Sequence, residues 1–194
     1  DIDTFCEVGR ITNLSSPRYI HFVSDTKAYV TQIWDNRIFI VNPKTFQITG
    51  HIVCPNMTME SGSTEQMVQR GDYLYVNCWS YQNRILKIDT RTDSIVAELT
   101  VGIQPTSLTL DCNGKLWTIT DGGFAGSPYG YEAPALYCID AESFTIEKQF
   151  SFQVKAYIDY EWDEENPDDW DDLRKYVEVK SDGYLYIQGC KITN

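Results

Sequence analysis

Aromatic side chains stand beside polar amides at two matching places in the sequence. Trp34 lies two residues before Asn36, and Trp79 and Tyr81 lie shortly before Asn83. Trp and Tyr provide a large contact area for few frozen torsions, and amides add directional hydrogen bonds. These five side chains are therefore candidates for binding a ligand or a partner protein.

A third candidate segment covers residues 121–134 and combines glycine, proline and aromatic residues. It contains Asp121, Tyr129 and Tyr131. This composition suggests either a shaped loop held over a ligand or a loop packed on its own sheet.

Two charged residues join the candidates. Arg18 follows Pro17 at the start of a strand-like run, where its guanidinium could reach a central channel or form an intramolecular salt bridge. Glu65, like Glu60 in the same polar segment, could accept hydrogen bonds from a ligand or cap local structure.

Catalytic motifs are absent from the sequence. His21 and His51 fall on different strand-like runs. Neither has the neighbouring catalytic or metal-ligating residues that a Ser-His-Asp relay or a metal site needs. The six cysteines form no CxxC pair, and they read either as small buried hydrophobes or as one or more disulfides. We therefore expect no enzymatic activity, no metal and no cofactor.

A repeated block of residues shows how these candidates are positioned. Residues 36–45 align without gaps on residues 83–92 and 134–143, and residues 1–11 fit residues 42–52. An Asp or Asn with Thr or Ser three residues later recurs at positions 1, 42, 89 and 140. Such a pair can hydrogen-bond its own backbone, so each anchor predicts a tight turn between two strands.

Strand-like runs around each anchor complete units of four strands. Before each anchor come two runs separated by a polar turn, then the run that ends at the anchor, and a further run follows it. The expected first strands are 19–22, 66–69, 107–110 and 176–179; the second strands are 27–31, 73–77, 115–119 and 184–188; the fourth strands are 47–53, 94–101 and 145–152. Four antiparallel strands repeating at intervals of 41, 47 and 51 residues are typical of a propeller blade. The predicted fold class is all-β, a β-propeller of four-stranded antiparallel blades.

Blade geometry predicts one shared face for the candidate residues. The loops that join second to third strands, and those that join one blade to the next, should lie on the same side of a propeller. These loops are 32–36, 78–83, 121–134, 13–18, 55–65 and 102–106.

The repeat also divides the chain. We predict propeller blades over residues 1–152, with residues 1–11 ending one blade and residues 12–56, 57–102 and 103–152 forming three more. Residues 153–175 form an acidic insertion that is expected to be helical, since Asn166 can cap a helix and Pro167 can start it. Residues 176–194 hold the first strands of a further blade. These units do not obviously close a ring, so the chain is expected to be about half of a longer propeller; in the alternative, Cys6–Ile11 closes a small ring with the last strands.

Charge and hydropathy exclude two classes of partner. The formal net charge is −12, and residues 159–172 hold nine acids and no base, which argues against nucleic acid as a partner. No stretch approaches the about 20 apolar residues of a membrane-spanning helix, so the protein is either soluble or has lost a targeting segment.

Several blade segments resemble a known family. Lys27–Thr31 together with Arg37–Asn42 resembles the YVTN-type β-propeller repeat. Residues 17–22, 77–85, 117–123 and 126–130 look like the surface-layer-protein type of propeller lipoprotein from Gram-negative gut bacteria. The resemblance covers residues 1 to about 152, and the chain departs from the pattern from about Gln153 onward.

This resemblance implies a seven- or eight-bladed propeller that is lipid-anchored on the extracellular face of the outer membrane. One branch of the family captures vitamin B12 and covers a TonB-dependent transporter. We therefore expect a binding propeller that captures a nutrient, with a corrinoid as the best guess, for an outer-membrane transporter. A protein-interaction module without a small ligand and a propeller enzyme of the lactonase or quinoprotein type are the alternatives.

Overall fold

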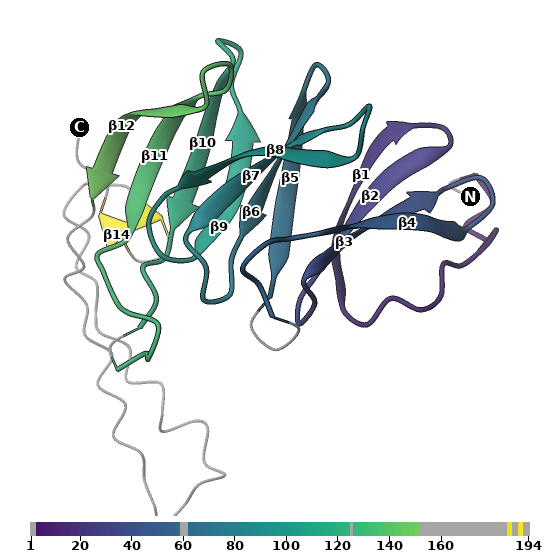
Figure 1. Cartoon of the computed structure of the whole chain (residues 1–194), viewed down its shortest axis with the longest axis horizontal. Coiled ribbons are helices and arrows are strands. Elements are labelled where there is room, and N and C mark those ends of the chain that lie inside the picture. Colours follow the sequence, from purple (N-terminus) through teal and green to yellow (C-terminus); the bar gives the residue numbers. More distant parts are fainter. Residues whose placement is uncertain (1–2, 59–61, 125, 152–185, 188–189, 192–194) are drawn as a thin grey trace, which may run out of the picture.

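The computed structural model describes residues 3–58, 62–124, 126–151, 186–187 and 190–191, and the described part is built of β-strands (Figure 1). Twelve of the strands form three antiparallel four-stranded sheets, each in simple sequential order. The first sheet contains β1 (Pro17–Ser24), β2 (Lys27–Gln32), β3 (Arg37–Asn42) and β4 (Gln47–Val53). The second contains β5 (Thr64–Arg70), β6 (Tyr73–Cys78), β7 (Arg84–Asp89) and β8 (Ser94–Thr100). The third contains β9 (Pro105–Leu110), β10 (Lys115–Thr120), β11 (Ala135–Asp140) and β12 (Thr145–Ser151).

The turn between the third and fourth strand of each sheet forms at the predicted Asn or Asp. Oδ1 of Asn42 accepts hydrogen bonds from the backbone N–H groups of Lys44 (2.9 Å) and Thr45 (3.3 Å). Asp89 and Asp140 accept from their own turns in the same way. The residue four positions after each anchor has a left-handed backbone, with φ between 55° and 57° at Phe5, Phe46, Asp93 and Phe144. This shared conformation marks the repeat in the backbone itself.

The sheets pack face to face, which explains why the central strands are buried on both sides. In β6, Leu74 and Val76 point into the core shared with the first sheet, whereas Tyr75 points into the core shared with the third. The alternation follows from the two-residue period of a strand. The other face of the first sheet is covered by Ile11 and Leu14 of the N-terminal segment.

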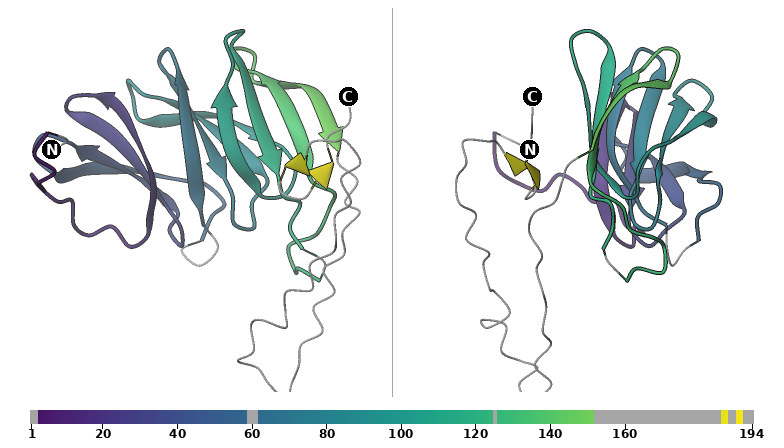
Figure 2. Two further views of the ribbon diagram at one scale, coloured as in Figure 1. Left: turned by 180° about the vertical axis from the view of Figure 1, so that it is seen from behind. Right: turned by 90° about the vertical axis from the view of Figure 1, so that its left-hand side faces the viewer.

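The three sheets are arranged as a fan (Figures 1 and 2). The first strands β1, β5 and β9 lie side by side, and the remaining strands of each sheet extend away from them in order. This is the arrangement of blades around an axis, with β1, β5 and β9 innermost. The N-terminal and C-terminal sheets stand at opposite ends of the fan, so the described part is an open arc of three blades (Figure 1).

Some predicted segments receive no test here. Residues 152–185, which include the predicted acidic helix and the strand 176–179, lie outside the described residues. From the last predicted strand, 184–188, residues 186–187 are described, and they form β13 (Tyr186–Ile187), which pairs with β14 (Cys190–Lys191). Cys6–Ile11 forms no strand, so the small ring closed through it has no support in the described residues. The division of the chain into domains stays a prediction.

Candidate functional site

The loops predicted to share a face are joined to one another by backbone hydrogen bonds. The N–H of Asp35 donates to Gly62 O (3.2 Å), which ties the first blade to the second. Gln104 N donates to Gln82 O (2.8 Å), and Asp121 N donates to Gln104 O (3.1 Å), which ties the second blade to the third. We call the surface made by residues 33–36, 54–58, 62–63, 79–83, 101–104, 121–124 and 126–134 the loop face.

A pocket of about 160 Å³ lies where the inner strands reach the loop face, and it is lined by Arg18, Tyr19, Glu65, Trp79 and Thr106. Three of these residues occupy the same place in successive blades. Arg18, Glu65 and Thr106 are each the second residue of an inner strand, and the residue before each pairs with the last residue of the neighbouring second strand. The repeat therefore brings a cation, an acid and a hydroxyl to one point near the axis.

Arg18 and Glu65 form the charged centre of this pocket. Arg18 Nε lies 3.0 Å and 3.1 Å from the two carboxylate oxygens of Glu65, and the hydroxyl of Ser63 donates to the same carboxylate at 3.1 Å. The Glu65 side chain is 4% exposed and that of Arg18 is 45% exposed. Within the described residues the Nη atoms of Arg18 make no hydrogen bond, so they remain available to an acceptor group.

Trp79 connects this centre to the long loop of the third blade. Its indole Nε1 donates to Asp121 Oδ2 (3.2 Å), and Asp121 Oδ1 accepts from the backbone N–H of Gly123 (2.9 Å). Four of the ten predicted site residues thus form two bonded pairs, Arg18 with Glu65 and Trp79 with Asp121, and the pocket brings Trp79 beside the first pair.

The remaining aromatic candidates lie on the loop face around the pocket. Tyr81 stacks on Tyr129 with ring centroids 4.1 Å apart, whereas Trp34 and Tyr131 are about half exposed. Trp34 and Tyr81 both have a left-handed backbone, with φ of 58° and 57°. Bulky side chains rarely adopt this conformation, but Phe46 and Phe144 share it in the hairpin turns, so it does not by itself mark a functional site. Phe124, which the sequence analysis did not select, is also exposed on this surface.

Two predicted site residues, Asn36 and Asn83, accept backbone hydrogen bonds within their own blades. The backbone carbonyls of Asn36 and Asn83 accept from the N–H groups of Cys54 (2.7 Å) and Val101 (2.8 Å). These bonds join the residue before the third strand to the residue after the fourth strand in the first two blades, and neither asparagine lines the Arg18 pocket. Glu60 lies outside the described residues.

Tyr19 and Thr106 line the pocket but were not predicted. The signal for Thr106 was present in the sequence, because Thr106 stands at the same position of its inner strand as Arg18 and Glu65. The predicted first strands were wrong at their starts, since they begin two residues earlier than predicted in all three blades. The equivalence of Thr106 with Arg18 and Glu65 therefore could not be seen.

Other reactive side chains have roles in packing. His21 Nε2 lies 2.9 Å from Gln69 Oε1 across the first two inner strands. Cys54, Cys78 and Cys138 are buried, and burial raises the pKa of the Cys54 thiol to about 12 and that of Cys78 well above its usual value. These thiols stay protonated and behave as small hydrophobes. The described residues include no group of three or more His, Cys, Asp or Glu that could hold a metal ion, and no helix long and apolar enough to cross a membrane.

Solved structures with the same architecture identify the fold. The chain is similar to hydrazine synthase from Kuenenia stuttgartiensis, with a TM-score of 0.66 and 18% identity over 79% of this chain and 42% of that one. It is also similar to dihydro-heme d1 dehydrogenase NirN in complex with DHE (TM-score 0.57, 16% identity, 78% of this chain and 32% of that one). BamB from Moraxella catarrhalis is a further similar structure (TM-score 0.52, 10% identity, 74% of this chain and 41% of that one). The chain is a β-propeller scaffold. It spans less than half the length of each of these propellers, and no family model and no curated protein sequence matches it.

These similarities correct one expectation. The sequence analysis predicted a chain that is not an enzyme, and that prediction is contradicted by two similar propellers that are enzymes by name, a synthase and a dehydrogenase. Blades of this architecture are compatible with catalysis because a fold does not determine the chemistry of the sites placed on it. The absence of a few nucleophile and metal motifs was too narrow a test.

Proposed function

We propose that the chain is part of a propeller that captures a ligand on its loop face, with the Arg18–Glu65–Trp79 pocket as the anchoring point. One observation carries this proposal: a guanidinium that is held by a buried carboxylate still presents its Nη donors beside an indole. A donor fixed before binding loses little conformational freedom when the ligand arrives.

The size of the pocket restricts the manner of binding. Ligand pockets usually measure about 300–1,000 Å³, whereas this one measures about 160 Å³. We infer that the pocket receives one carbonyl or carboxylate arm of the ligand and that the rest lies across Trp34, Tyr81 and Tyr129. A corrinoid fits this description, because its flat macrocycle is edged by amide side chains.

The family resemblance supports the biological setting of the proposal. A propeller of the surface-layer type would hold the nutrient on the extracellular face of the outer membrane, attached by a lipid anchor, and pass it to a TonB-dependent transporter. The aromatic loop face would then contact both the nutrient and the transporter.

Calorimetric titration with cyanocobalamin tests the corrinoid version. We expect binding at micromolar ligand, and we expect Trp79→Ala to weaken it by about tenfold or more, since aromatic anchors of this kind contribute about 2 kcal/mol. Lys44→Ala is the matched control, because Lys44 is an exposed residue in the hairpin of β3 and β4, away from the loop face. Absence of heat at micromolar ligand would remove the corrinoid from the proposal.

A protein partner is the second candidate, and a specific observation favours it. Trp34, Phe124, Tyr129 and Tyr131 are all about half exposed on the loop face, and exposed aromatics of this kind mark interaction surfaces. Pull-down from outer-membrane extracts with the wild-type chain and with Trp34→Ala separates the two candidates. A partner that is lost with Trp34 while no corrinoid binds would favour the protein-interaction module.

A further inference from the structure

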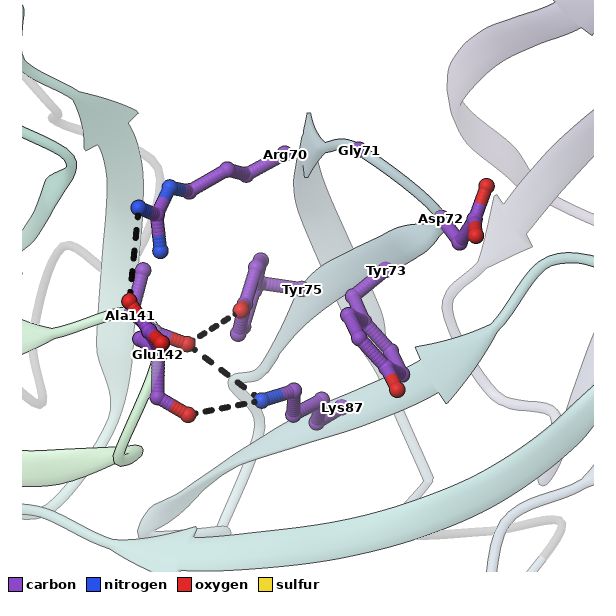
Figure 3. A pocket seen from close by; sticks show the side chains of 8 residues that line it. All are labelled: Arg70, Gly71, Asp72, Tyr73, Tyr75, Lys87, Ala141 and Glu142. Carbon is purple, nitrogen blue, oxygen red and sulfur yellow. Dashed lines mark hydrogen bonds and ion pairs between the residues drawn. The ribbon is translucent and has the colours of Figure 1, made fainter.

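A second pocket, of about 310 Å³, lies between the second and third blades (Figure 3). Its lining residues come mainly from the hairpin turns at the strand ends opposite those that lead into the loop face. Its walls come from the turn between β5 and β6, from β7, and from the turn between β11 and β12. Arg70 and Lys87 extend into it from two sides, with the ring of Tyr75 between them (Figure 3). Its volume is in the range of small-molecule sites.

Lys87 is a buried cation that pairs with no carboxylate among the residues that the structure describes. The residue is 9% exposed, and its Nζ donates to the backbone carbonyls of Ala141 (3.3 Å) and Glu142 (3.2 Å). Its Nζ also lies 4.5 Å from the ring centroid of Tyr73 and 5.6 Å from that of Tyr75. An ammonium has three donors, and within the described residues the third has no acceptor.

The repeat provides an internal comparison at the junction of the first two blades. There Lys27 Nζ donates to Thr90 O (2.6 Å), the carbonyl that corresponds to Ala141 O, and pairs with Asp93 Oδ1 at 2.5 Å. In the third blade the position of Asp93 is taken by Phe144, whose ring centroid lies 5.7 Å from Lys87 Nζ. The same junction therefore carries a neutralised lysine in one place and an uncompensated lysine in the other.

The acids near the second pocket are engaged with other cations or exposed to solvent. Asp72 pairs with Arg91 (3.2 Å). Glu142 is 86% exposed and lies 3.9 Å from Arg70, too far for a hydrogen bond. Burial lowers the pKa of Lys87 and the nearby guanidinium of Arg70 lowers it further, whereas Asp140, which pairs with Lys115, and Glu142 act in the opposite direction without reversing the shift. An anion bound in the pocket beside the two cations would offset both effects.

We propose that this pocket binds a small organic monocarboxylate, with the carboxylate held by Arg70 and Lys87 beside the ring of Tyr75 and the apolar part against Tyr73. Arginine presents a fork that matches a carboxylate, and lysine adds a point charge. The acids Asp72 and Glu142 at the rim disfavour a doubly charged ligand, which is why a carboxylate fits better than a phosphate. The site is independent of the loop face and of the function proposed for it.

Titration of the full chain with benzoate, using calorimetry, tests the proposal. Benzamide is the matched uncharged probe, and we expect it to bind at least about tenfold more weakly, because a charge-assisted hydrogen bond contributes about 1.5–3 kcal/mol. Arg70→Gln and Lys87→Met should each weaken benzoate binding by about the same factor. Lys44→Met, which removes an exposed lysine outside this pocket, should leave binding unchanged.

A second measurement avoids the risk that a variant at the buried Lys87 fails to fold. Benzoate should slow the acylation of Lys87 in the wild-type chain and should leave the acylation of Lys44 unchanged, as followed by mass spectrometry of the labelled peptides. Equal binding of benzamide and benzoate, or full benzoate affinity in Arg70→Gln, would overturn the proposal. Tighter binding of inorganic phosphate that is lost in Arg70→Gln would overturn the assignment of a carboxylate.

Discussion

At the residue scale, the Arg18–Glu65 pair joins a half-exposed guanidinium to a buried carboxylate, and the two partners are not equivalent. Removing Arg18 leaves a buried charge whose one remaining side-chain donor among the described residues is the Ser63 hydroxyl. Removing the charge of Glu65 leaves a guanidinium that can turn to water. An uncompensated buried charge is far more costly than an uncompensated exposed one.

We therefore expect Arg18→Met to destabilise the protein more than Glu65→Gln. The first change should lower the free energy of unfolding by about 2 kcal/mol and the second by about 1 kcal/mol, after allowing for the solvent around Arg18. Urea unfolding of the two variants and of the double variant measures this. The double variant should lose less than the sum of the single losses. Equal losses for the two single variants would show that Glu65 is solvated in solution.

Asp89 allows a second prediction, on pH. Hydrogen bonds from the side chain and backbone of Arg91 lower the pKa of Asp89 to about 2, from an ordinary value of 3.8. A carboxyl with a depressed pKa stabilises the fold above its unfolded pKa, and this contribution is lost as the pH falls from about 4 through about 2. The urea midpoint of the wild type should fall over this window. In Asp89→Asn the fall of the urea midpoint should be shallower. An identical pH profile would exclude Asp89 as a source of the stability that is lost at acidic pH.

At this scale the residue types select candidate side chains, but they do not give the register of the inner strands. Arg18, Glu65, Trp79 and Asp121 were selected by residue type, and the structure pairs Arg18 with Glu65 and Trp79 with Asp121. Thr106 was missed because its role depends on its position in an inner strand, and a hydroxyl alone is no signal. Whether these residues bind a ligand stays a prediction.

At the element scale, the loop face depends on close backbone contacts between blades. At Gly62, a Cβ would lie 2.6 Å from the backbone oxygens of Asp35 and Thr58, so any larger residue must move the loops. Gly71, in the turn between β5 and β6, has φ of +58° but open space around the missing Cβ. The two glycines are needed for different reasons, one for contact and one for backbone conformation.

This difference predicts unequal effects of alanine. Gly71→Ala should cost about 1 kcal/mol, the strain of a left-handed alanine. Gly62→Ala should cost more, about 2–3 kcal/mol, since backbone rather than a flexible side chain must give way. Thermal unfolding compares the two variants, and tryptophan fluorescence reports on Trp34 and Trp79 in the loops beside Gly62. If Gly71→Ala were the more damaging change, the contact between Gly62 and Asp35 would not exist in solution.

Strand assignment from sequence was accurate wherever a turn signal bounded the strand. The fourth strand of the first blade was predicted at 47–53 and is observed at Gln47–Val53. The Asn and Asp anchors explain this accuracy, because they fix the chain reversal by local hydrogen bonds. The inner strands were predicted too short, since their first residues follow irregular loops without a local signal.

At the scale of the whole molecule, stability in such an array comes from the interfaces between neighbouring blades. The second blade has a core on each face, whereas the first and third blades each share a core with one neighbouring described blade. The strand β7 is buried at all six positions, and β12 is exposed at all seven. The repeat in the sequence predicts blades that are equally buried. The observed difference in burial arises from the open arc of the described blades, which no local sequence pattern encodes.

Hydrogen exchange followed by mass spectrometry should therefore rank the blades. Amides of β6 and β7 should exchange slowest, because opening them disrupts the cores on both sides of the second blade. Amides of β12 should exchange early, since among the described strands β12 pairs with β11 alone and its exposed face includes Ile146 and Phe150. The β8 amides are the internal control, because β8 is also the last strand of its sheet but belongs to the central blade. Protection of β12 above that of β8 would mean that in solution another element covers this edge, and the apolar side chains on β12 would then be part of an interface.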